Sequence, residues 1–272
     1  MKRWRGYLGI GVLVSLAALS AKVPIAAADV ELKPTAAKSD GKSGGASASD
    51  PTAGVSYLDF KPRYVNLPKG KEESVLEIEG VHAFAPSFTV KYEVIAVRSN
   101  QTGDWNTDLR EFKLRPLYLH PIEPFGIKAK FGVGVEWFQD LSSSRTGTGT
   151  GTNEIAPLLG IGWLPTDKDF LVTLVQYFHS YHEDRDFDEV RATGPRIIYI
   201  RSLPSINGWG KADLRTRINH KDDNDFTQTL ELQLGRMVTD KIGLFGEVFL
   251  GDDVFDSDDF DHAAGFGVRF LY

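Results

Sequence analysis

The chain has no cysteine among its 272 residues. It therefore forms no disulfide and no thiolate metal site, and packing and hydrogen bonds must stabilise it even in an oxidising compartment. Basic residues are in the minority, and the resulting net charge of −6 argues against nucleic acid as a partner. Beyond residue 28 no run approaches 18 consecutive apolar residues, which excludes a transmembrane helix there.

What is present begins with the pattern of a secretory signal over residues 1–28. A positively charged start precedes Leu8–Leu19, an apolar run too short to span a bilayer, and Ala26–Ala28 supply the small residues of a cleavage site. Residues 29–53 contain almost no large apolar side chain, so they are predicted to be a disordered periplasmic tail. The remainder, 54–272, is predicted to be one domain.

Within this domain, apolar and polar residues alternate in segments of about eight to fourteen residues. A period of two indicates a β-strand with two unlike faces. Pro195 interrupts one segment and removes a hydrogen-bond donor, while 169–182 is apolar on both faces in its middle. Twelve strands are predicted, at 55–66, 73–83, 87–98, 108–119, 126–138, 153–163, 169–182, 189–202, 208–219, 226–237, 241–250 and 261–272.

The connections between these segments alternate between short turns and mostly longer polar loops. This layout is typical of outer-membrane barrels, in which the turns are periplasmic and the loops lie outside. The predicted fold is therefore all-β, a transmembrane antiparallel up-and-down β-barrel of about twelve strands. A soluble β-sandwich or lipocalin-like barrel would also alternate. Aromatic residues toward the segment ends favour the membrane barrel, namely Tyr57, Trp137, Trp163, Tyr177, Tyr199 and Trp209.

The C-terminal segment ends on an aromatic residue and places Phe266, Val268, Phe270 and Tyr272 on one face. It resembles the terminal-strand signal of Gram-negative outer-membrane proteins, which the barrel-assembly machinery recognises. The resemblance implies a location in the cell outer membrane, in contact with its lipid and lipopolysaccharide. An even number of strands would leave both termini in the periplasm.

If the apolar faces meet lipid, the opposite faces line the lumen, where basic and acidic residues are close to balance. Two hypotheses follow: a narrow porin or channel for small hydrophilic, polar or charged solutes, or a closed, salt-bridged barrel with a structural or partner-binding role. The channel is the working hypothesis, without any cofactor, metal or catalytic residue. The predicted lumen-lining residues are Lys113, Arg115, Lys128, Lys130, Arg215 and Arg217, with the acids Glu93, Glu111, Glu136, Glu231 and Glu247.

Three connecting segments, 182–189, 221–225 and 251–261, are strongly acidic. Their carboxylates are the ligand type for divalent cations that bridge lipopolysaccharide, although solvated loops have the same composition. The Thr-Gly repeat 146–152 is predicted to be a flexible loop tip.

An enzyme is the remaining alternative, because the general plan is similar to outer-membrane phospholipase A, a twelve-stranded barrel. That family needs a His and a Ser two residues apart on the lipid-facing side, with an Asn on the next strand. His179 matches the His, but Tyr181 stands where the Ser should be, and Ser180 belongs to the opposite face. With no Asn between Val190 and Arg201, phospholipase activity is not predicted. Similarity to the nucleoside-channel barrels is one of architecture only.

Overall fold

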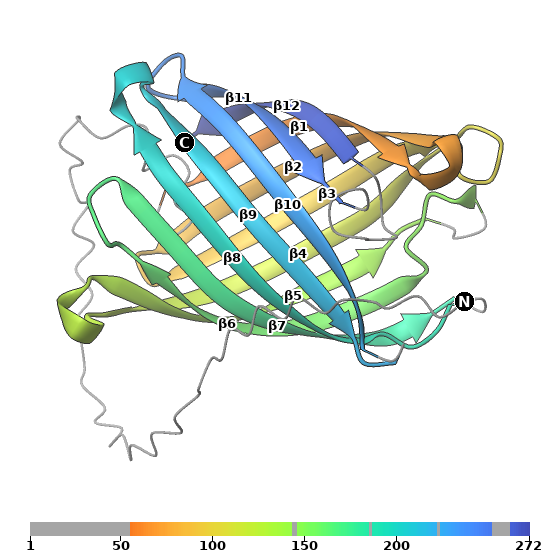
Figure 1. Cartoon of the computed structure of the whole chain (residues 1–272), viewed down its shortest axis with the longest axis horizontal. Coiled ribbons are helices and arrows are strands. Elements are labelled where there is room, and N and C mark those ends of the chain that lie inside the picture. The colour runs from red at the N-terminus through yellow and green to blue at the C-terminus, as the bar shows by residue number, and fades with distance from the viewer. Residues whose placement is uncertain (1–54, 143–145, 185–186, 222–223, 252–261) are drawn as a thin grey trace, which may run out of the picture. The chain divides into compact units, whose positions relative to one another are not determined.

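The computed structural model describes residues 55–142, 146–184, 187–221, 224–251 and 262–272. Twelve strands close into an antiparallel barrel in which each pairs with its sequence neighbours and β1 (Tyr57–Leu67) pairs with β12 (His262–Leu271) (Figure 1). This confirms the predicted fold class and strand number. The predicted signal peptide and periplasmic tail lie outside the described residues.

The remaining strands follow in chain order around the barrel. They are β2 (Lys71–Ala85), β3 (Phe88–Ser99), β4 (Asn106–Ile122), β5 (Ala129–Asp140), β6 (Thr152–Trp163), β7 (Asp169–Glu183), β8 (Arg191–Leu203), β9 (Gly208–Asn219), β10 (Asp225–Met237) and β11 (Ile242–Leu250). Three short 3-10 turns each begin with proline, at Pro68–Gly70, Pro124–Gly126 and Pro204–Ile206. In the described part of the chain, no helix is long and apolar enough to cross a bilayer.

Strand β10 shows how the alternating sequence divides the two faces of the wall. Leu232 and Leu234 point outward and are 40% and 58% exposed, whereas Glu231 points inward and is 3% exposed. Exposed leucines and buried carboxylates are the reverse of a water-soluble protein. A lipocalin-like barrel would carry its apolar face inside, so this distribution excludes that alternative.

Two connection types mark the two ends of the barrel. The end that holds Tyr57 and Leu271, called here the turn end, also holds the short connections such as 86–87 and 204–207. The other, called here the loop end, holds the connections 100–105 and 141–151. Both termini of the described barrel therefore lie at the turn end.

Pro195 is accommodated inside β8 because the ladder is locally interrupted. Pairing between β8 and β9 passes from Thr193 directly to Arg196, so Gly194 and Pro195 have no paired residue on β9. On its other side Pro195 still lies opposite Val175 of β7. A residue without an N–H is tolerated where it need not donate to the ladder.

Two of the predicted interface aromatics face the interior instead. Tyr57 is 7% exposed and Trp209 is fully buried, while Trp137, Tyr177 and Tyr199 lie outside as expected and are each at least 38% exposed. Trp209 lies on the same face of β9 as the inward Lys211 and Asp213, and Tyr57 lies on the same face of β1 as Asp59. The alternation of side chains along each strand therefore turns both rings inward. Position near a segment end does not specify a face.

Trp209, Met237 and Phe245 form a buried cluster at the turn end, with Leu271 packed against it. Glycines in the wall make room for the two rings. A Cβ at Gly235 would lie 2.3 Å from the Trp209 ring, and one at Gly267 would lie 2.1 Å from the Phe245 ring. The rings therefore lie directly on the backbone of the neighbouring strands.

Substituting Gly235→Val should force the Trp209 ring away from the wall and destabilise the barrel by about 1–3 kcal/mol, the usual cost of overpacking. Urea unfolding in lipid vesicles, followed by tryptophan fluorescence, measures this change. Gly246→Val is the matched control, because the nearest atom to a Cβ there is 4.0 Å away. Equal stability of both variants would contradict the close packing of Trp209.

Candidate functional site

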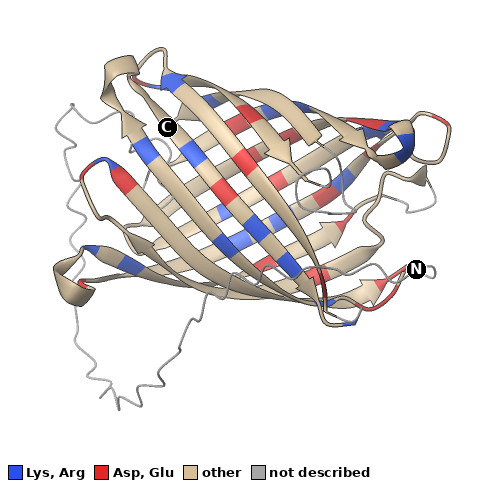
Figure 2. Ribbon diagram, in the orientation of Figure 1, with Lys and Arg blue, Asp and Glu red and all other residues tan. Residues whose placement is uncertain are grey.

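All twelve strands contribute side chains to one cavity of about 390 Å³ inside the barrel. Charged residues concentrate on its inner wall, and Figure 2 shows basic and acidic bands alternating along β9 and its neighbours. The interior is thus polar where the exterior is apolar. This is the candidate functional site.

Most of the predicted lumen residues face this interior. Seven line the cavity itself: Lys113, Arg115, Lys130, Arg215, Glu93, Glu136 and Glu231. Glu111 and Glu247 are buried and form ion pairs with lumen residues, and Arg217 pairs with Glu154. Lys128 is placed elsewhere, because β5 begins only at Ala129 and Lys128 is exposed in the preceding turn. The alternation of inward and outward side chains holds only within a strand, so it does not place Lys128.

Charged residues outside this predicted set also belong to the interior. They include Glu73, Arg110, Glu154 and Arg196. Arg110 lies at a bulge where the β3–β4 register shifts, and Arg196 directly follows the proline of β8. Glu154 is in phase with Ala156 and Leu158 on β6, so continued alternation could have identified it.

On β1 to β4 the charges form a continuous ladder. Lys61 Nζ lies 2.6 Å from Glu79, which also lies 3.1 Å from Lys91. Lys91 continues to Glu93 at 3.4 Å, and Glu93 contacts Lys113 at 2.8 Å. Each carboxylate therefore has a basic neighbour on an adjacent strand, which offsets the cost of removing it from water.

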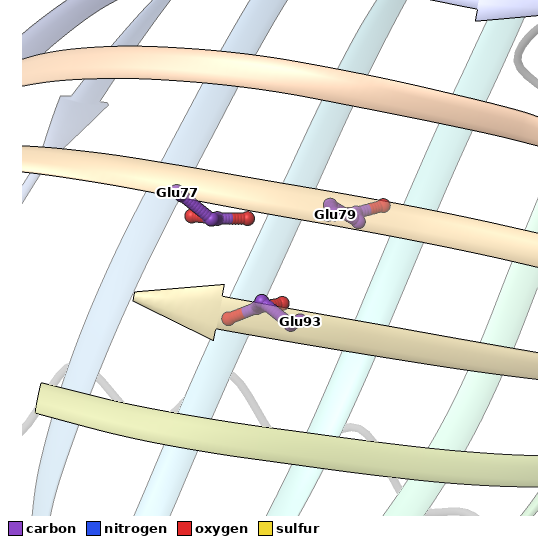
Figure 3. A group of neighbouring side chains, drawn as sticks. All are labelled: Glu77, Glu79 and Glu93. Atoms are coloured by element: carbon purple, nitrogen blue, oxygen red, sulfur yellow. The ribbon is translucent and has the colours of Figure 1, made fainter. Parts of the chain in front are cut away.

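Three carboxylates of this ladder, Glu77 and Glu79 of β2 and Glu93 of β3, offer oxygens within 4.8 Å of one another (Figure 3). Such a group has the donor type of a divalent-cation site. However, Lys61 contacts both Glu77 and Glu79, and Lys91 contacts both Glu79 and Glu93. The negative charge is already balanced, so the arrangement is an ion-pair cluster.

A second network covers β8 to β10 and centres on the fully buried Asp213. Arg196 lies 2.5 Å from Asp213 and Arg215 lies 3.0 Å from it. Arg215 also reaches Glu231 at 2.5 Å, and Lys211 contacts the same carboxylate. The two networks place ion pairs on both sides of the lumen.

A third pair closes the seam between the first and last strands. Arg269 donates two hydrogen bonds to Asp59, at 2.8 and 2.6 Å, and the two residues are direct cross-strand partners. The guanidinium also lies over the rings of Tyr57, Trp209 and Phe245, at 4.2, 5.2 and 5.6 Å. This assembly fills the turn end of the lumen on the side of β9 to β1.

The basic members of these pairs reach further into the lumen than the acidic ones. The Arg215 side chain is 43% exposed while its partner Asp213 is 0% exposed, and Lys113 is 21% exposed against 9% for Glu93. Among the described lumen pairs, only Lys61 and Glu79 are equally exposed. Lys and Arg side chains are longer, so they cover the carboxylates that lie near the wall. A solute would therefore meet a positive surface although the charges are close to balance.

The wall formed by the turn-end halves of β4 to β8 is different, because it is apolar apart from Lys130 near the start of β5. Leu117, Val172, Leu174 and Ile198 are half-buried and line the cavity. No charged residue occurs in β6 between Ile155 and Trp163, or in β7 between Phe170 and His182. The inner face of β7 belongs to this apolar wall, which explains why the segment 169–182 is apolar on both faces.

The Thr-Gly repeat is packed at the loop end, in contrast to the expected flexible tip. Thr148 is fully buried, its hydroxyl donates to Asp108 and its carbonyl accepts from Arg110. Arg110 in turn pairs with the buried Glu73 of β2 at 2.5 Å. The small Thr and Gly residues let this loop fold against the inner side of β4.

The acidic loops are only partly within the described residues, and 252–261 lies outside them. In the β7–β8 loop, Glu189 contacts Lys221 at 2.9 Å and Arg191 at 2.5 Å. Hydrogen bonds from Lys221 and Arg191 lower the pKa of this exposed carboxyl group. Basic partners within the chain thus balance Glu189.

His179 and Ser180 lie on opposite faces of β7, as the sequence indicated. The His179 side chain is 45% exposed, and its Nδ1 lies 4.0 Å from Glu189. Ser180 is 3% exposed, and its hydroxyl donates a hydrogen bond to the carboxylate of Glu183. The imidazole therefore cannot activate this serine, and the two do not form the pair that phospholipase chemistry requires.

No family model matches the sequence, and no curated protein was found to match it. Solved structures do. The COG4313 outer membrane channel from Pseudomonas putida F1 matches with a TM-score of 0.58 and 9% identity, over 80% of this chain and 95% of that one. The chain has the fold of twelve-stranded outer-membrane barrels.

Two porins have the same architecture. The NanC porin matches with a TM-score of 0.56 and 12% identity, over 78% of this chain and 97% of that one. The KdgM porin matches with a TM-score of 0.51 and 10% identity, over 79% and 99% of the respective chains. At these identities the likeness concerns the fold of the barrel, and its lumen has to be interpreted from its own residues.

Proposed function

We propose that the barrel is a narrow outer-membrane channel for small polar or charged solutes, with a preference for anions. The observation that carries this proposal is the layering of charge in the lumen, where Lys and Arg side chains are more exposed than the Asp and Glu with which they pair. The three solved structures reported above are described as porins or as a channel, which supports the same class of function.

The dimensions favour small solutes. Twelve strands lie between the filled eight-stranded barrel and the wide sixteen-stranded porin. Three ion pairs of the described residues join strands that are not neighbours: Arg217 of β9 to Glu154 of β6, Arg63 of β1 to Glu247 of β11, and Arg110 of β4 to Glu73 of β2. An anion can pass from one exposed cation to the next, each holding it only weakly because a carboxylate competes for the same group.

Planar-bilayer recording tests this proposal on the protein purified from outer-membrane fractions. We expect discrete conductance steps and, across a potassium chloride gradient, a reversal potential of the sign that chloride preference produces. A reversal potential of the opposite sign, which indicates a preference for cations, would contradict the proposed anion preference. A correctly folded barrel without conductance would favour the alternative of a closed structural barrel, which the paired charges and the Arg269 cluster at the turn end support.

The proposal places the turn end and both termini of the barrel in the periplasm. It assigns recognition by the assembly machinery to the outer face of β12, where Phe266, Phe270 and Tyr272 are 64%, 38% and 60% exposed. Replacing Phe270 and Tyr272 by serine should reduce the amount of folded barrel in outer-membrane fractions. Phe226→Ser is the control, since this outward aromatic of β10 is 51% exposed. An equal loss in both variants would argue against a role specific to β12.

A further inference from the structure

The lumen has two chemically different sides. In the closed strand order β6 lies opposite β12, and β7 lies opposite β1. The apolar wall of β4 to β8 therefore faces the side that carries the Lys61 ladder and the Arg269 seam. Figure 2 shows the same division, since the middle of β6 and β7 lacks the coloured bands of the other strands. A lumen that served only strongly hydrated solutes would gain nothing from such a wall.

The apolar wall is continuous. Leu174 packs on the backbone of Gly160, where a Cβ would lie only 2.6 Å from that of Leu174. Leu117 approaches Gly132 in the same way, at 3.5 Å. The leucines thus spread over glycine backbone, and the cavity lining here is apolar apart from Lys130 of β5. Contact with this wall is favourable for an apolar group and costs a hydroxylated one part of its hydration.

A basic residue borders the apolar wall on each flank. Arg115 precedes Leu117 on the inner face of β4, and Arg196 precedes Ile198 on the inner face of β8. Two residues along a strand correspond to about 7 Å. A carboxylate held at Arg115 would therefore leave the group attached to it over Leu117. The guanidinium of Arg115 already binds the Glu136 carboxylate at 2.6 Å. A carboxylate of the solute can replace that of Glu136 because it makes the same type of charge-assisted hydrogen bond.

From this juxtaposition we infer that the lumen binds small amphipathic anions, in which a carboxylate is attached to an apolar body such as one aromatic ring or a short alkyl chain. The inference names the solute class of the proposed channel and rests on that function for transport. A cavity of about 390 Å³ is near the lower end of the range of small-molecule sites, about 300–1,000 Å³. Neutral sugars lack the charge, and sugar acids lack the apolar face.

The test compares benzoate with glucuronate, two monoanions that each carry a carboxylate on a six-membered ring. Isothermal titration calorimetry of the full chain in detergent should show benzoate binding about tenfold more tightly, because only its ring can bury apolar surface on β4 to β8. Leu174→Asn should remove this advantage by lowering the affinity for benzoate to about that for glucuronate. Leu174→Met, which keeps the apolar surface, should preserve it.

Equal affinity for the two anions would overturn the inference, as would an unchanged ratio in the Leu174→Asn variant. Bilayer recording of the same samples separates this failure from that of the channel. Chloride conductance with equal affinities would retain the channel and discard the amphipathic solute class. Benzoate-selective binding without conductance would discard the channel and leave a binding site of the inferred chemistry.

Discussion

Replacing Arg215 and Arg217 by glutamate is expected to change the preference of the channel from anions to cations. These are the most exposed basic side chains of the described ion pairs in the lumen, at 43% and 40%. Each substitution converts a positive group that faces the solute path into a negative one. The buried carboxylates Asp213 and Glu231 then each lose one of their basic partners. The reversal potential across a potassium chloride gradient should change sign.

Arg201→Glu is the matched control for this reversal. Arg201 is also basic and exposed, at 54%, but it lies at the turn-end rim on the outer face of β8 and pairs with Asp169. Arg215→Gln with Arg217→Gln is a milder variant that avoids placing a glutamate beside Glu154, and it should reduce the anion preference without inverting it. An unchanged reversal potential in folded double variants would place the ion path away from β9.

Replacing Arg269 by alanine is expected to cost about 3–5 kcal/mol of stability, the usual effect of removing one partner of a buried ion pair. Asp59 and Arg269 are 1% and 5% exposed. Without the guanidinium the Asp59 carboxylate would be buried and uncompensated, and three aromatic rings would lose their shared contact. Urea unfolding in vesicles and the temperature at which the barrel unfolds in detergent gels measure the change.

A surface pair gives the control for the Arg269 substitution. Arg191 lies 2.5 Å from Glu189, but its side chain is 49% exposed, so Arg191→Ala should cost at most about 1 kcal/mol. The double variant Asp59→Leu with Arg269→Met should recover part of the loss, because neither charge is then left alone in the wall. Equal stability of the alanine variants at 269 and 191 would show that the Asp59–Arg269 ion pair contributes little to the stability of the seam.

The seam pair also illustrates how chain closure depends on distant residues. Asp59 and Arg269 are separated by 210 positions in the sequence and become neighbours only when β1 meets β12. Alternation along each strand accounts for the inward orientation of both residues. Their partnership required the register of two strands at opposite ends of the chain.

Alternation determined most of what could be known from the sequence. It predicted the closed barrel, its twelve strands and the inward orientation of residues such as Glu93, Lys113 and Arg215, because the face of a strand residue depends on its own backbone and its immediate neighbours. Alternation failed outside the strands, because Lys128 precedes the first residue of β5 and Thr148 is packed in a loop.

The tertiary structure alone decided what the interior presents to a solute. The sequence contains nearly equal numbers of acidic and basic lumen residues, but only the packed barrel places the short carboxylates against the wall and the longer Lys and Arg side chains above them. Likewise, the apolar inner faces of β4 to β8 become one wall only when these strands lie side by side. Charge layering and the apolar wall depend on curvature, side-chain length and cross-strand contacts, and these arise between residues far apart in the chain.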